Sequence, residues 1–297
     1  MAADSVMQQA VRLGAGTDAL AALAAHVRLE TEQLPADPAV RELLRAIAAQ
    51  LLDGEPDVPG GPPAVAVVGL VRTVLRQAAE LVENPGRSGG WDAVDPPLLQ
   101  SIGRMSMGVA DAIRAAEEQL PALGERLRAP GAAFLDVGTG TGWLAMAVAR
   151  AHPDLSVVGI DVFAPALELA RGNLVGTDLA GRIDLHLQDA AELDEPDRYD
   201  AVWLPMPFLP PIVVPAVVAA ASRALKPGGW LLPGTFAGPG DPLSQLLTDL
   251  RTVRSGGRPW QPAELVELLT SAGLTDVREV DRTWPAPARL YAGRRPG

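Results

Sequence analysis

The stretch from Phe134 to Trp143, FLDVGTGTGW, decides the fold of the domain around it. It reads as a short apolar strand that carries Asp136, then a turn with glycine at every second position, then the start of a helix. Glycine reaches backbone angles that other residues avoid and leaves room for a ligand against the main chain. This order predicts a nucleotide-type binding loop at the carboxyl end of a strand.

A second apolar run, SVVGID from Ser156 to Asp161, also ends in an acidic residue. One strand–helix–strand unit brings two such strand ends side by side, and an acidic residue there can accept hydrogen bonds from ribose hydroxyls. Dinucleotides and other adenosine cofactors both fit this arrangement. The glycine spacing decides between them.

The dinucleotide fingerprint G-x-G-x-x-G would place its third glycine where this chain has Trp143. Asp136 also puts a carboxylate beside the loop, where it would repel a pyrophosphate. A cofactor with a cationic end suits the loop better, and S-adenosylmethionine carries both a sulfonium and an ammonium group. A turn that needs glycine only for its geometry is the alternative.

With the later motifs LQDA (187–190), YDAVWLP (199–205) and LKPGGWL (225–231), residues 131–297 resemble the class I S-adenosylmethionine-dependent methyltransferases. The resemblance implies that one set of residues binds S-adenosyl-L-methionine: Asp136, Gly138, Thr139, Gly140 and Gly142 around the methionine part, Asp161 on the ribose, Val162 against adenine, Asp189 and Ala190 near the adenine amino group, and Leu204 at the strand end that faces the transferable methyl.

Apolar runs alternate with helical ones from Ala132 onward, which predicts an α/β, Rossmann-like and mostly parallel sheet with helices on both faces. We expect seven strands: 132–137, 156–161, 182–188, 199–204, 229–236, and a closing antiparallel pair at 274–281 and 288–293. Residues 131–297 then form the cofactor-binding domain.

Residues 1–130 are predicted to be all-helical, with helices over 18–34, 37–52, 64–82 and 95–119 and a linker from Pro121 to Gly131. We expect this region to be a cap that selects the acceptor or a dimerisation domain. The oligomeric state stays open, with a homodimer among the options.

Five residues are candidates for the acceptor side. Gln100 and Arg104 share one face of a helix at i, i+4 spacing, and Met206, Phe208 and Phe236 follow the fourth and fifth strands. At Leu204 the chain lacks the Asn or Asp that amide and base N-methyltransferases place there, which disfavours that subtype. No residue is predicted as the general base, because His152 and His186 do not fall at the strand ends that should hold the ligand.

Composition excludes several classes of function. The formal charge of −11 argues against nucleic acid as a substrate. The chain has no cysteine, and its three histidines are scattered, so we predict no metal site. We see no apolar run of about 18 residues and no signal peptide, and we expect a cytoplasmic protein without a membrane span. Lys226 is the only lysine beside 24 arginines (25 − 1), a bias typical of a GC-rich bacterial genome.

The favoured interpretation is a bacterial methyltransferase with a small-molecule substrate, in secondary metabolism. The first alternative is another reaction of S-adenosylmethionine, intramolecular cyclisation or aminocarboxypropyl transfer, which would release methylthioadenosine. The second is a methyltransferase-like binding protein without catalysis.

Overall fold

The computed structural model describes residues 2–54, 56, 58, 61–90, 95–238 and 240–297 of the 297-residue chain. The chain divides into two compact units, Met1–Pro85 and Gly86–Gly297. The boundary therefore falls at Pro85, whereas the sequence placed it at residue 130. No helix in the described part is both long and apolar enough to cross a membrane.

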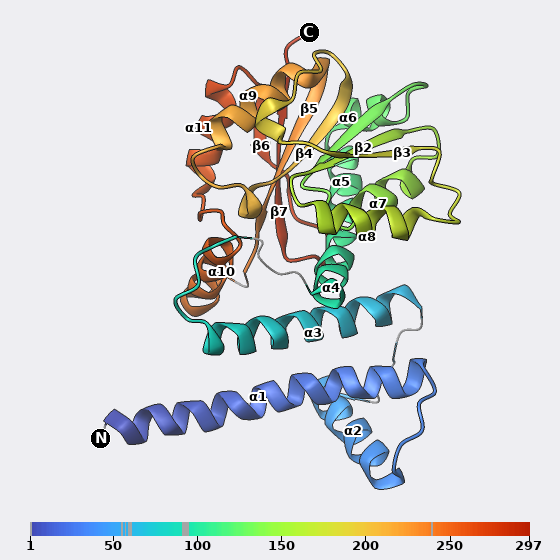
Figure 1. The fold of residues 1–297 in the computed structure, drawn as a ribbon. Coiled ribbons are helices and arrows are strands. Elements are labelled where there is room, and N and C mark those ends of the chain that lie inside the picture. The colour runs from blue at the N-terminus through green and yellow to red at the C-terminus, as the bar shows by residue number, and fades with distance from the viewer. Residues whose placement is uncertain (1, 55, 57, 59–60, 91–94, 239) are drawn as a thin grey trace. The chain divides into compact units, whose positions relative to one another are not determined.

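The described residues of the first unit form three helices, α1 (Ala2–Thr31), α2 (Pro38–Leu51) and α3 (Pro62–Glu83) (Figure 1). The carboxylate of Asp37 caps α2 by accepting a 2.9 Å hydrogen bond from the backbone N–H of Ala39. The first helix begins at Ala2, well before the predicted start at residue 18, because its N-terminal half contains no proline to stop it. The buried core of this unit is small and rests on Val27, Ala64 and Val68.

Helices α4 (Pro96–Ser106), α5 (Gly108–Gln119) and α6 (Pro121–Leu127) open the second unit. The sequence predicted one helix over 95–119 and a linker from Pro121 to Gly131, and both predictions were wrong in detail. The first helix breaks at Met107, and Pro121 starts a new helix because proline fits the first helical position.

The second unit is built on a seven-stranded sheet in the order β3-β2-β1-β4-β5-β7-β6. Six strands run in one direction and β7 runs antiparallel to β5 and β6. This confirms the predicted fold class. The strands are β1 (Ala133–Val137), β2 (Ser156–Asp161), β3 (Ile183–Leu187), β4 (Tyr199–Pro205), β5 (Leu225–Phe236), β6 (Thr275–Glu279) and β7 (Ala288–Arg294).

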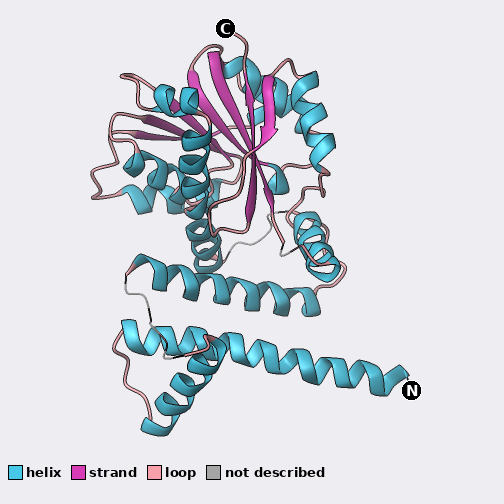
Figure 2. Ribbon diagram, turned by 180° about the vertical axis from the view of Figure 1, so that it is seen from behind, coloured by secondary structure: helices cyan, strands magenta, loops and turns pink. Residues whose placement is uncertain are grey.

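Helices cover both faces of this sheet (Figures 1 and 2). The remaining helices are α7 (Trp143–Ala151), α8 (Ala164–Leu174), α9 (Val214–Ala224), α10 (Pro242–Arg254) and α11 (Pro262–Ser271). Side chains alternate between the faces along each strand. Phe134 packs into a core with α5 and α7, and its neighbour Leu135 packs into a second core with α9 and α11. The order of strands reverses beside β1, and ligands of such sheets bind at that point.

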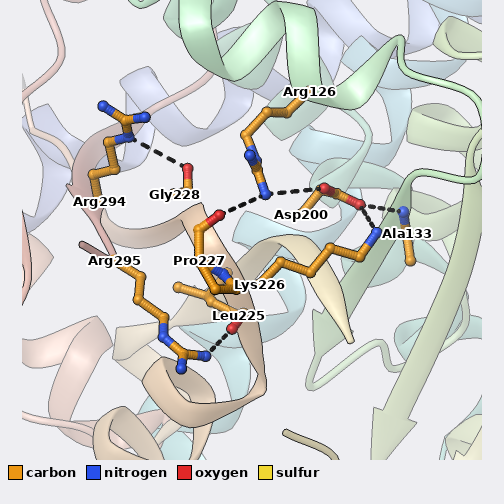
Figure 3. Close-up of polar contacts among 9 residues, drawn as sticks. All are labelled: Arg126, Ala133, Asp200, Leu225, Lys226, Pro227, Gly228, Arg294 and Arg295. Atoms are coloured by element: carbon orange, nitrogen blue, oxygen red, sulfur yellow. Dashed lines mark hydrogen bonds and ion pairs between the residues drawn. The ribbon is translucent and has the colours of Figure 1, made fainter. Parts of the chain in front are cut away.

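A cluster of charges closes the opposite end of the sheet, where β1, β4 and β5 begin (Figure 3). The buried Asp200 pairs with Lys226 at 2.6 Å and with Arg126 at 3.4 Å, and accepts a 2.9 Å hydrogen bond from the backbone N–H of Ala133. Arg126 also donates to the carbonyl of Pro227. These contacts fix α6 and the first residues of β5 to the sheet, far from the strand ends that face the glycine loop.

Candidate active site

The loop between β1 and α7 needs its three glycines for backbone geometry. Gly138, Gly140 and Gly142 have φ values of 64°, 55° and 79°, a region that strains side chains with a Cβ. A Cβ at Gly138 would lie 3.0 Å from the Pro205 side chain, so this glycine also allows β4 to approach. A Cβ at Gly140 would meet nothing closer than 4.0 Å, which leaves open space over the middle of the loop.

Asp161 fixes this loop to the end of β2. Its carboxylate accepts 2.8 Å hydrogen bonds from the backbone N–H groups of Gly140 and Phe163. Burial raises the pKa of Asp161, although the backbone N–H groups of Phe163, Gly140 and Val162 act in the opposite direction. The two predicted acidic residues therefore do come together, and one of them also supports the loop.

Asp136 is a buried carboxyl group near the end of β1. Its side chain is 1% exposed and accepts a 2.8 Å hydrogen bond from the Thr139 hydroxyl. The pKa of Asp136 is raised to about 7, mainly by burial; the Thr139 hydrogen bond lowers this pKa, and the charge of Asp161 raises it. The described residues offer no cation in ion-pair contact with this carboxyl, so the site as built favours a positively charged ligand.

The predicted adenine-side residues line the neighbouring strand ends. Val162 directly follows Asp161 and its side chain is 70% exposed, so an apolar surface is available there. Asp189 is exposed beyond β3 and caps a short 3-10 helix through a 2.8 Å hydrogen bond from the N–H of Ala191. Ala190 is buried.

Of the four predicted site residues at the ends of β4 and β5, two are buried and two are partly exposed. Leu204 and Met206 are fully buried in the second core, and their roles beside the transferable methyl and the acceptor stay predictions. Phe208, in the 3-10 helix η2 (Met206–Phe208), and Phe236 are partly exposed and meet edge to face at 5.6 Å between ring centroids.

Helix α4 reaches the cofactor loop through hydrogen bonds that the sequence did not reveal. The Gln100 amide oxygen accepts from the Trp143 indole at 2.7 Å and from Asn173 at 3.1 Å. Asn173 also donates to the Thr141 carbonyl at 2.9 Å. A Cβ on Gly103 would lie 1.9 Å from the Thr141 hydroxyl, so α4 packs directly against the loop.

Arg104, the other predicted residue of this helix, is exposed, with its guanidinium carbon 5.1 Å from the centroid of the Trp143 ring. Asn173 carried no signal in the sequence, because its two partner segments lie far away along the chain.

The residues of this site fit S-adenosylmethionine. The buried Asp136 carboxyl suits its ammonium group. The hydroxyl of Thr141 is buried without a hydrogen-bond partner, and the space over Gly140 is open for a ligand. Asp136 and Gly138–Gly142 would hold the methionine part, and Asp161 and Val162 the adenosine. When bound, the cofactor supplies an electrophilic methyl group on sulfur. Among the described residues, no three His, Asp or Glu side chains gather as a metal site would require.

Known proteins with similar sequences are methyltransferases. A family model described as "Methyltransferase domain" matches residues 134–229. A ubiquinone biosynthesis O-methyltransferase from Thiobacillus denitrificans is 32% identical over 177 residues, which cover 55% of this chain and 74% of that protein. Other curated methyltransferases match over 31% to 73% of their own length.

Solved structures show the same fold over nearly the whole chain. Human N-acetylserotonin methyltransferase in complex with S-adenosylmethionine has a TM-score of 0.66 at 16% identity, over 98% of both chains. The mitomycin 7-O-methyltransferase MmcR has a TM-score of 0.60 at 21% identity, over 99% of this chain and 98% of that chain. Together with the matched domain and the Thiobacillus relative, the loop and its two carboxylates identify this chain as a member of the class I S-adenosylmethionine-dependent methyltransferases.

Proposed function

We propose that this methyltransferase transfers a methyl group to an oxygen atom of a small molecule in bacterial secondary metabolism. The observation that carries the proposal is the pair Phe208 and Phe236, which forms an edge-to-face aromatic contact after the ends of β4 and β5. Leu204 offers no side-chain oxygen to an amine, so oxygen is favoured over nitrogen as the acceptor atom. The name of the Thiobacillus relative supports the same assignment.

The proposed reaction asks little of the protein beyond positioning. Methyl transfer from a sulfonium is an in-line displacement with a good leaving group, so the chain aligns the reactants and excludes water. His152 is buried against Glu117 and His186 is exposed within β3, so neither stands at the strand ends as a base. An acceptor that arrives already ionised fits this site, because it needs no general base.

The net charge of the chain and the remaining candidate residues also bear on the proposed substrate. A net charge of −11 supports a small-molecule substrate over nucleic acid and is compatible with action in the cytoplasm. Asp189 and Ala190 remain candidates for the adenine side. Gln100 and Arg104 remain candidates for the acceptor side, with Gln100 already engaged by Trp143 and Asn173.

We also propose that the chain forms a homodimer through the first unit. Helix α2 exposes an apolar stripe at helical spacing, made of Val40, Leu43, Ile47 and Leu51. Such a stripe on a small three-helix unit supports contact with a second copy of the chain. The predicted role of the N-terminal region as an acceptor-selecting cap stays a prediction.

Product analysis tests the proposed activity. The protein is incubated with S-adenosylmethionine and a panel of phenolic acceptors, and the adenosine product is identified by mass spectrometry. S-adenosylhomocysteine with a product 14 mass units heavier than the acceptor is the expected result. Methylthioadenosine would show attack at another carbon, and the absence of both products would point to a binding protein.

A further inference from the structure

Arg251, on α10, is a half-buried cation without a counter-charge. Burial lowers the pKa of its guanidinium, and no carboxylate offsets that effect. Within the described parts of the chain, the guanidinium has no ion pair and no hydrogen bond. Removing a charge from water costs free energy unless a partner compensates it. An anion bound at this guanidinium would therefore be stabilising.

Other partly buried arginines of the same unit have their partners in place. Arg126 pairs with Asp200, and Arg258 pairs with Glu264 at 3.1 Å. Arg182 donates to the carbonyls of Ala149 and His152 at 2.8 and 3.0 Å. The difference at Arg251 is therefore local and does not reflect a general shortage of acceptors.

The neighbours of Arg251 are the aromatic residues of the proposed acceptor side. Its guanidinium carbon lies 5.9 Å from the centroid of Phe236, and Phe236 contacts Phe208 edge to face. Phe236 also lines a small pocket, whose charged lining residues are Asp249, Arg258 and Arg289. Arg251 and Phe208 do not line this pocket and adjoin it through Phe236.

A short series of contacts leads from the cofactor loop to this arginine. Gly138 of the loop lies against Pro205, the last residue of β4. Phe208 follows three residues later, and Phe236 ends the adjacent strand β5, which pairs with β4 up to Gly234. Arg251 is therefore connected to the cofactor loop through Phe236, Phe208 and the end of β4.

We propose that Arg251 binds the carboxylate of an aromatic acid, whose ring lies against Phe208 and Phe236. This inference names the substrate class and rests on the proposed small-molecule methylation. A local cation is needed for such a substrate, because a protein with a net charge of −11 otherwise repels anions. A guanidinium is the side chain best suited to bind a carboxylate with two parallel hydrogen bonds.

The test is calorimetric binding of a matched pair of probes to the full chain in the presence of S-adenosylhomocysteine. The probes are 3,4-dihydroxybenzoate and 3,4-dihydroxybenzamide, which share size and ring and differ in charge. The acid is expected to bind the wild type at least tenfold more tightly than the amide. Arg251→Gln should abolish this preference, and Arg251→Lys should retain part of it. Arg254→Gln, at the other basic residue in the last turn of α10, should leave the preference unchanged.

Equal affinity of the two probes for the wild type would overturn the inference, as would a preference that survives in Arg251→Gln. A loss of preference in Arg254→Gln as well would assign the effect to the helix end and would overturn it too. Release of S-adenosylhomocysteine from S-adenosylmethionine is measured separately. If the acid is preferred through Arg251 but no acceptor is methylated, the proposed function fails and the anion site stands.

Discussion

At the scale of single residues, the carboxylates of Asp136 and Asp161 are the candidates for binding the cationic cofactor. Asp161 accepts hydrogen bonds from the backbone N–H groups of Gly140 and Phe163. The family resemblance implies that the same carboxylate also binds the ribose. Asp161→Ala should weaken S-adenosylmethionine binding by about 1.5–3 kcal/mol, or roughly 10- to 150-fold in Kd. Titration calorimetry measures this change. His186→Ala, at an exposed position on β3, is the control that should bind normally, and an unchanged affinity in Asp161→Ala would show that this carboxylate does not contact the cofactor.

The negative charge of Asp136 should lower the stability of the ligand-free protein and strengthen binding of the cofactor. Its pKa of about 7 lies above the ordinary value of 3.8, so the folded protein binds more protons than the unfolded chain between pH 4 and 7. The contribution of Asp136 to the free energy of unfolding is therefore highest below pH 4, and it falls as the pH rises through 7. Asp136→Asn should raise the melting temperature of the ligand-free protein at pH 8, with a smaller gain at pH 5, and should weaken cofactor binding.

Thermal denaturation from pH 5 to 8.5, with and without S-adenosylmethionine, measures both effects. An Asp136→Asn protein that is less stable than the wild type at pH 8 would contradict the argument. In that case the carboxylate would have to be stabilised by its surroundings.

At the scale of elements, α4 packs directly against the glycine loop, so a change in either one should displace the other. Gly103→Ala would bring a Cβ to 1.9 Å from the Thr141 hydroxyl, so either the helix or the loop must move. We expect lower cofactor affinity and a lower melting temperature. Gly172→Ala on α8 is the matched control, because a Cβ there meets nothing within 4 Å. That change should stabilise the protein by about 0.5–1 kcal/mol. Equal behaviour of the two variants in calorimetry and melting would refute the contact.

Local patterns in the sequence were sufficient for the sheet and the loop. Alternating apolar strands, the three glycines and the acidic residues at strand ends are short-range signals, and the first five strands were placed within a few residues. The contact of Gln100 with Trp143 and Asn173 was not predictable, because it joins segments 43 and 73 residues apart. The burial of Leu204 and Met206 was missed for a related reason, since only packing decides which face of a strand end lies against a helix.

At the scale of the whole molecule, the described part of the first unit exposes several large apolar side chains. Leu43 is 64% exposed on α2, whereas the buried apolar cluster described for this unit is formed by Val27, Ala64 and Val68. We expect a dimer in light scattering coupled to size exclusion, and Leu43→Ser with Ile47→Ser should convert it to a monomer. Leu246→Ser with Leu250→Ser on α10 is the matched control, since it removes exposed leucines of the second unit. A monomeric wild type, or dissociation caused only by the α10 pair, would refute the α2 interface.

The ion pair between Lys226 and Asp200 gives this protein a built-in reporter of local opening. Lys226 is the chain's only lysine, and its amine is held at 2.6 Å from a buried carboxylate. An amine-reactive reagent therefore has one side-chain target, and rupture of the ion pair at the start of β5 should raise the reactivity of that amine. An increase in the acylation rate of this side chain would report opening at this end of the sheet. Acylation also removes the charge that Asp200 needs, so the labelled protein should not close again as it did before.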